Sequence, residues 1–149
     1  MLMKKYKKMP YVGAVMTPFP YSVETDDGIA EVERLMAEHR IRHIPVQHAG
    51  HVVGIVSERD LLRYIDRSLA APDKMHIRAR DIMVADPFIV AFDTPLNEVA
   101  LEMARRRIRS VIILHHDKLA GILSATDICR ILAEILESEF SPPTGDDAA

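Results

Sequence analysis

The chain of 149 residues has no tryptophan, a single cysteine and only 5% aromatic residues. One cysteine, Cys129, excludes an intramolecular disulfide framework and a zinc site built from several cysteines. Such scarcity of cysteine is typical of a reducing compartment, so a cytoplasmic protein is expected. With so few aromatics, the chain also lacks the surfaces on which proteins stack single-stranded nucleic acid.

A large excess of positive charge and a long apolar run are missing too. The formal net charge is −3, whereas nucleic-acid binding needs a strongly basic face. No apolar run reaches the roughly 18 residues that a membrane helix needs, and the basic N-terminus is not followed by the apolar stretch of a secretory signal. The sequence therefore predicts neither a nucleic-acid partner nor a membrane partner, while its 48% apolar residues suffice for a folded core.

What the sequence does contain is an internal repeat with an offset of 67 residues. From Met16 to Tyr64, 17 of 49 positions are identical to the residue 67 positions later, and the match has no gap. A repeat of this kind decides the architecture. Because a unit of about 60 residues buries little surface alone, the two copies are expected to pack sheet against sheet and to share one core.

Each copy is predicted to run strand, helix, strand, strand, helix. The first strand is a β-branched and aromatic run, and apolar residues at helical spacing follow it. In the second copy Thr94 and Pro95 predict the helix start, with Thr94 as the cap. The next two strands are joined by a short polar connector, which indicates a hairpin, and the first strand should lie parallel to its neighbour. The expected strands are 21–25, 44–47 and 52–56, then 88–92, 111–114 and 119–123, and the closing helices are 58–68 and 125–137.

The boundaries follow from local composition. Pro72 and Asp73 break the helical pattern between the copies. The last residues combine proline, glycine and acidic residues, which is typical of a disordered tail. The expected organisation is a basic N-terminal segment (1–9), repeat one (10–68), a linker (69–75), repeat two (76–137) and a disordered tail (138–149).

Three motifs in each copy carry a family resemblance. In the first copy they are Val15-Met16-Thr17-Pro18, Arg42-His43-Ile44-Pro45-Val46 and Gly54-Ile55-Val56-Ser57-Glu58-Arg59-Asp60-Leu61. In the second they are Ile82-Met83, Arg109-Ser110-Val111-Ile112-Ile113 and Gly121-Ile122-Leu123-Ser124-Ala125-Thr126-Asp127-Ile128. In this order, and repeated at one offset, they resemble the CBS domain (the cystathionine β-synthase repeat). The resemblance covers about residues 10–137, and a tandem pair of such repeats is a Bateman module.

The resemblance implies an α/β (α+β) fold in which two tandem β-α-β-β-α repeats pack as a pseudo-twofold intramolecular pair. It implies a sensor that binds AMP, ADP, ATP or S-adenosylmethionine in the cleft between the repeats, as a regulatory ligand and not as a prosthetic group. It also implies a homodimer, in which two tandem pairs form a disc, and an unidentified protein that the pair regulates. A ligand-free dimeric scaffold for protein interaction is the alternative.

The binding chemistry is expected where a strand turns into a helix, at Ser57-x-x-Asp60 and Ser124-x-x-Asp127. Unpaired N–H groups and the helix dipole favour an anion such as phosphate there, and a carboxylate can accept hydrogen bonds from both ribose hydroxyls. The same spacing also fits a capping box, in which the aspartate bonds to its own helix start. The two roles compete for the aspartates, and the resemblance favours ligand binding.

The resemblance also implies two composite sites, each formed by the strand-to-helix turn of one copy and the first strand of the other. Isoleucines would flank the adenine. Because guanidinium pairs bidentately with phosphate oxygens, the phosphates would be contacted by Arg42, His43, Arg59 and Arg109. Arg59 matches Thr126 in the second copy, so the two sites are expected to differ in affinity or phosphate preference. The first site would comprise Met16, Tyr21, Ile41, Arg42, His43, Ile122, Ser124, Thr126 and Asp127, and the second Ile55, Ser57, Arg59, Asp60, Met83, Phe88, Ile108, Arg109 and Ser110.

The sequence predicts neither metal binding nor catalysis. Several histidines lie near the first hairpin, but no cysteine or glutamate completes a zinc motif around them. No metal site is therefore predicted, and a metal or pH sensor is a weaker alternative. Cys129 matches Leu62 and is expected to be a small buried apolar residue of the last helix. No Ser-His-Asp elbow, P-loop or dinucleotide glycine motif occurs, so no enzyme activity is predicted.

Overall fold

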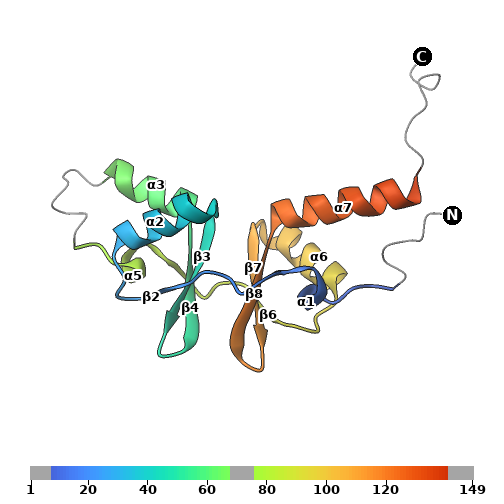
Figure 1. Ribbon diagram of the computed structural model, residues 1–149, viewed down its shortest axis with the longest axis horizontal. Coiled ribbons are helices and arrows are strands. Elements are labelled where there is room, and N and C mark those ends of the chain that lie inside the picture. The colour runs from blue at the N-terminus through green and yellow to red at the C-terminus, as the bar shows by residue number, and fades with distance from the viewer. Residues whose placement is uncertain (1–7, 68–75, 141–149) are drawn as a thin grey trace, which may run out of the picture.

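The computed structural model describes residues 8–67 and 76–140 (Figure 1), with only the backbone for residues 66 and 67. Most of the predicted basic segment (1–9), the predicted linker (69–75) and most of the predicted tail (138–149) lie outside the described residues. Two similar units stand side by side, and in each a hairpin points to one side while the helices gather at the other (Figure 1). This arrangement confirms the mixed α/β fold of two tandem repeats.

The first copy forms a unit around three of its own strands. β2 (Val23–Glu24) pairs in parallel with β3 (His43–His48), and the helix α2 (Ile29–His39) connects them. β3 and β4 (His51–Ser57) form an antiparallel hairpin, and α3 (Glu58–Arg67) begins directly after β4. The predicted hairpin, the parallel pairing and the closing helix of this copy are confirmed.

The second copy repeats this arrangement. β6 (Ile89–Ala91) pairs in parallel with β7 (Ser110–His115), and α6 (Leu96–Arg106) connects them. β7 and β8 (Lys118–Ser124) form the second hairpin, and α7 (Ala125–Glu139) follows. Every predicted strand overlaps an observed strand, and the ends differ by one or two residues.

The start of α6 differs from the prediction. Pro95, and not Thr94, occupies the cap position, and it makes no side-chain cap. Thr94 has another role, because its carbonyl oxygen accepts a hydrogen bond of 2.8 Å from the N–H of Val12. In the first copy the carbonyl of Asp27 accepts a bond of 2.8 Å from the N–H of Ala79. The loop before α6 and the loop before α2 therefore each bind a segment from the other copy: Thr94 binds the segment at Val12, and Asp27 binds the segment at Ala79.

These segments are exchanged between the two units, which the sequence analysis did not predict. α1 (Val12–Val15) and β1 (Thr17–Pro18) open the first copy but join the second unit (Figure 1). β1 pairs antiparallel with β8, and Val12 is fully buried in the core of the second unit. α5 (Ala79–Ile82) and β5 (Val84–Ala85) open the second copy but join the first unit, where β5 pairs with β4. Each unit is thus completed by the first residues of the other copy.

Two glycines let the exchanged segments approach the sheets closely. A Cβ at Gly54 in β4 would lie 2.5 Å from Sδ of Met83, which no real side chain tolerates. Gly121 in β8 faces Met16 in the same way. A residue with a side chain at either position would push the methionine and the short strand beyond it away from the sheet.

Two hydrophobic cores form, one in each unit, so the expected single shared core is wrong. Pro45 and Ile112 are fully buried but belong to neither core. Pro45 on β3 and Ile112 on β7 lie on the face of each sheet that points away from its core. Strand β4 of one sheet contacts strand β8 of the other. The two sheets therefore meet face to face, as predicted, outside the cores. The first core is centred on Val23, Ile29, Val32, Ile44, Val46 and Val56, and the second on Val12, Leu96, Val99, Val111, Ile113 and Leu123.

The prediction of a buried Cys129 is also wrong, because its side chain is exposed. Its match in the first copy, Leu62, is 51% exposed. Cys129 and Leu62 therefore occupy equivalent positions on α7 and α3, and on both helices this position faces away from the core. Ile131 is buried only two residues further along, and such a step turns a helix to its other face. Leu132 shares the outer face of α7 with Cys129, three residues away.

Candidate functional site

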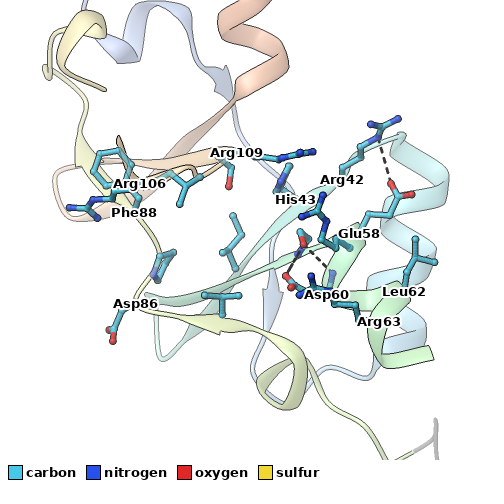
Figure 2. A pocket seen from close by; sticks show the side chains of 17 residues that line it. Arg42, His43, Glu58, Asp60, Leu62, Arg63, Asp86, Phe88, Arg106 and Arg109 are labelled. Atoms are coloured by element: carbon cyan, nitrogen blue, oxygen red, sulfur yellow. Dashed lines mark hydrogen bonds and ion pairs between the residues drawn. The ribbon is translucent and has the colours of Figure 1, made fainter. Parts of the chain in front are cut away.

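A pocket of about 580 Å³ opens between the two units (Figure 2). The first unit contributes the start of β3, the end of β4 and the first turns of α3. The second unit contributes the segment between β5 and β6 and the chain between α6 and β7. The residues that line the pocket are Arg42, His43, Ile55, Ser57, Glu58, Arg59, Asp60, Leu62, Arg63, Val84, Asp86, Pro87, Phe88, Arg106, Ile108, Arg109 and Ser110.

The pocket brings together eight of the nine residues expected in the second site. The ninth, Met83, lies against Gly54 on β4. Arg42 and His43, which were expected in the first site, line this pocket as well. The eight residues are Ile55, Ser57, Arg59, Asp60, Phe88, Ile108, Arg109 and Ser110.

Asp60 occupies its own helix start, so the capping role is present in the structure. Its Oδ2 accepts hydrogen bonds from the N–H of Ser57 at 2.9 Å and from the hydroxyl of Ser57 at 2.7 Å. The N–H of Asp60 in turn donates to Ser57 Oγ at 3.1 Å (Figure 2). These bonds use one carboxylate oxygen. Within the described residues no hydrogen bond to Oδ1 is found, so this oxygen can accept from a ligand hydroxyl.

The second copy contains the same cap, but there both oxygens of the aspartate accept hydrogen bonds. Ser124 donates to Asp127 Oδ2 through its N–H at 2.8 Å and its hydroxyl at 2.9 Å. In addition, Arg130 donates to Asp127 Oδ1 at 2.8 Å. Arg63 stands at the matching position of the first copy, but there it lines the pocket and makes no ion pair with Asp60. The two helix starts therefore differ in how much of the carboxylate is available.

His43 stands in the wall of the pocket near both helix starts. Burial lowers the pKa of His43 below its ordinary value of 6.5, and the nearby guanidinium groups of Arg109 and Arg42 lower it further. The carboxylates of Asp60 and Asp127 act in the opposite direction and do not overcome burial. The imidazole is therefore neutral at neutral pH. In Figure 2 the guanidinium of Arg109 lies close to His43.

The basic side chains of the pocket fall into two groups. Arg42 pairs with Glu58 at 3.6 Å, and Arg106 pairs with Glu102 at 2.7 Å while its guanidinium carbon lies 4.8 Å from the centre of the Phe88 ring. Among the described side chains (8–65 and 76–140), no ion pair involves the other three guanidinium groups. These three belong to Arg59, Arg63 and Arg109.

The remaining residues of the first site come from both units: most lie beside β1, on β8 or at the start of α7, whereas Tyr21 and Ile41 lie beside α2 in the first unit. Ile122 lies opposite Thr17 in the sheet. Tyr21 stacks on His39 with ring centres 3.7 Å apart. Ser124 and Asp127 form the cap of α7. Arg42 and His43 line the pocket of the second site. These remaining residues lie nearby, because Ile41 directly precedes Arg42 and the carboxylate of Asp127 acts on the pKa of His43. The rest of the group is Met16, Ile41 and Thr126.

The pocket also contains residues that the sequence analysis missed. Arg63 follows Arg59 by four residues, and this helical spacing could have revealed it. Asp86 and Arg106 come from the second unit, and no local pattern in the sequence marks them.

The histidines of the hairpins are accounted for by local contacts. Thr25 Oγ1 lies 3.2 Å from Nδ1 of His48, and His115 stacks between Phe92 and His116. In the part of the chain that the structure describes, no three His, Cys, Asp or Glu side chains group as a metal site would require. Over the same residues, no helix has the length and apolar character to cross a membrane.

Comparison with known proteins identifies the family. The family model of the CBS domain matches twice, at residues 12–67 and 79–134. The chain belongs to the CBS domain family. It is a tandem pair of CBS domains, and the resemblance inferred from the motifs is confirmed.

Relatives of this CBS pair include stand-alone pairs and larger proteins. The crystal structure of the AcuB protein of Vibrio cholerae superposes with a TM-score of 0.76 at 28% identity, over 91% of this chain and 100% of that one. CBSX2, whose structure was solved in complex with AMP, superposes with a TM-score of 0.71 at 25% identity, over 84% and 97%. The inosine-5'-monophosphate dehydrogenase of Korarchaeum cryptofilum is 32% identical over 108 residues. The match covers 72% of this chain and spans only 21% of the dehydrogenase.

Proposed function

We propose that this CBS pair is a regulatory module that binds an adenosine-containing ligand in the pocket and has no catalytic activity of its own. One observation supports the proposal most strongly. Eight residues chosen from the sequence for one site, on segments far apart in the chain, line a single cavity. Its volume of about 580 Å³ lies within the range typical of small-molecule sites.

The chemistry of the walls suits each part of such a ligand. Ile55 and Ile108 offer apolar surface for a purine base. Asp60 offers a carboxylate oxygen that can accept from ribose hydroxyls. The guanidinium groups beside the N-terminus of α3 suit phosphate oxygens. The complex of the related CBSX2 with AMP supports this class of ligand.

A ligand in this position would touch both units, because each contributes part of the wall. It could therefore stabilise one relative arrangement of the units over another. A regulatory effect requires that the ligand bind the two arrangements with different affinity. The module would pass this difference to a partner protein, which we expect to be the target of regulation.

A ligand-free dimeric scaffold is the second candidate, and the outer face of α3 and α7 favours it. Leu62, Leu132 and Leu136 are 51%, 52% and 46% exposed on these helices. Exposed apolar residues that gather on a helix face commonly mark a protein interface. We propose that this face joins two pairs into a homodimer in the cytoplasm, whether or not a ligand binds.

A thermal-shift panel distinguishes the two candidates. The protein is heated with saturating adenosine, AMP, ADP, ATP or S-adenosylmethionine, and guanosine triphosphate serves as the base control. A ligand that binds only the folded state stabilises it by RT ln(1 + [L]/Kd), so at about one hundred times Kd the gain is about 2.7 kcal/mol. Regulation by an adenosine ligand predicts a clear rise in Tm for at least one adenosine compound.

If none of the five adenosine compounds raises Tm, the scaffold is the better account. Sedimentation velocity of the same sample then gives the oligomeric state. A dimer without ligand supports the scaffold, whereas a monomer contradicts the proposed dimer face.

A further inference from the structure

The charge of the pocket indicates which adenosine ligand it accepts, provided that the proposed function is right. Five arginines and three acidic residues line it. Glu58 is paired with Arg42, and the carboxylate of Asp60 is bonded to its own helix start. Asp86, the third acidic residue, forms no ion pair with an arginine of the pocket among the described side chains. Arg59, Arg63 and Arg109 are likewise in no ion pair there, and the five arginines outnumber the three acidic residues.

These three arginines approach the cavity from both sides. Arg59 and Arg63 are four residues apart on the first turns of α3, so they share one face of the helix. Arg109 precedes β7 in the other unit, and its carbonyl accepts a hydrogen bond of 2.8 Å from Ala125 at the start of α7. One phosphate group is readily satisfied by one or two guanidinium groups, since each pairs bidentately. Three guanidinium groups around one cavity suit a chain of phosphates.

The second copy shows that the fold itself does not need these charges. Thr126 replaces Arg59 there, and the capping bonds of Ser124 and Asp127 are the same as those of the first copy. Arg130 replaces Arg63, but it is bound to Asp127 at 2.8 Å. Because an equivalent helix start forms without the free guanidinium groups, a purely structural role does not explain the arginines of the pocket.

We propose that the pocket selects adenosine di- or triphosphate over AMP, and rejects adenosine compounds that carry a positive charge, such as S-adenosylmethionine. Its sulfonium and ammonium groups would be repelled by the guanidinium groups, and its single carboxylate offers them only one negative charge. A second or third phosphate would supply further negative charge and would lie at the positive end of α3. The helix start at Asp127 lacks this arrangement and does not share the preference.

Isothermal titration at fixed, low ionic strength tests the proposal. The full chain is titrated with adenosine, AMP, ADP, ATP and S-adenosylmethionine, and with inorganic triphosphate to separate the phosphates from the base. We expect affinity to rise from adenosine through AMP to ADP and ATP by at least about tenfold overall. S-adenosylmethionine should bind more weakly than adenosine, and added salt should weaken ATP most. Inorganic triphosphate should bind more weakly than ATP.

Arg59→Thr installs the residue of the second copy and is the matched variant. It should weaken ATP about tenfold and leave adenosine nearly unchanged. Arg105→Thr is the control, because Arg105 lies on α6, pairs with Glu102 and does not line the pocket. It should leave all affinities unchanged.

Two results would overturn the selectivity. One is equal affinity for AMP, ATP and S-adenosylmethionine in the unmodified protein. The other is an equal loss of adenosine and ATP in Arg59→Thr. Either result leaves adenosine binding itself intact, whereas a failure of every adenosine compound to bind contradicts the proposed function as well.

Discussion

His43 is a residue whose protonation should register in the stability of the whole protein. Burial holds its pKa below 6.5 in the folded state. Between that lowered value and 6.5, the unfolded chain binds a proton that the folded chain does not. The free energy of unfolding therefore rises with pH through this window, and it falls when the pH is lowered below about 6.5.

Urea unfolding at a series of pH values checks this prediction. The free energy of unfolding of the natural sequence should fall as the pH is lowered from about 7.5 to about 5.5. His43→Gln has no such proton to take up, so its stability should fall less steeply over that range. Parallel curves for the two proteins would show that His43 does not carry this pH dependence.

Asp60 and Asp127 show how far the role of a single residue can be predicted from the sequence. Their spacing to serine is compatible with two roles, and the structure places both in capping boxes. What distinguishes them is the behaviour of the arginine three residues later. Arg130 bonds to Asp127, whereas Arg63 lines the pocket. Since both positions are arginine, no sequence pattern could separate them.

At the scale of the elements, the exchanged segments hold the two units together. β5 pairs with β4 at Gly54, where an added Cβ would strike the side chain of Met83. We predict that Gly54→Ala destabilises the protein by about 1–3 kcal/mol through overpacking. Chemical denaturation measures the loss.

The double variant Gly54→Ala, Met83→Ala supplies the control. Shortening Met83 removes the atoms that an added Cβ would strike. Met83→Ala should therefore cost less in the Gly54→Ala background than in the natural protein, with a coupling of at least about 0.5 kcal/mol. Strictly additive losses would mean that the contact does not exist as described.

The elements that lie within a run of strand or helix pattern were predictable from sequence, including the short β2 and β6, and the exchanged segments were not. The hairpins and closing helices carry strong periodicity and lie within one or two residues of their predicted ends. β1 and β5 have two residues each, and α1 and α5 have four, which is too short for any periodic signal. Thr94 was expected to cap α6 because its side chain suits that role. Its backbone carbonyl is instead taken by α1, a contact that only the fold creates.

At the scale of the whole molecule, the repeat predicts the pair but not its asymmetry. Seventeen identities at one offset indicate two equal units, and the structure contains them as two cores and two sheets. The pocket is described on one side of the pair, where Arg59 and Arg63 stand. Its far wall comes from the other unit. Phe88 could be assigned to that wall from sequence only through the family resemblance, and Arg106 was not assigned.

We propose that the pocket at Asp60 binds an adenosine nucleotide, and a titration of two matched aspartate variants tests this proposal. ATP is titrated into the natural protein, Asp60→Asn and Asp127→Asn, with binding followed by calorimetry. Both substitutions keep an oxygen that can accept the capping bonds, so both proteins should fold with similar small losses of stability. The two substitutions therefore differ mainly in that Asp60 lines the pocket and Asp127 does not.

The account predicts that Asp60→Asn weakens ATP at least about tenfold, while Asp127→Asn changes it by less than about twofold. Unchanged affinity in Asp60→Asn, or an equal loss in both variants, would contradict it.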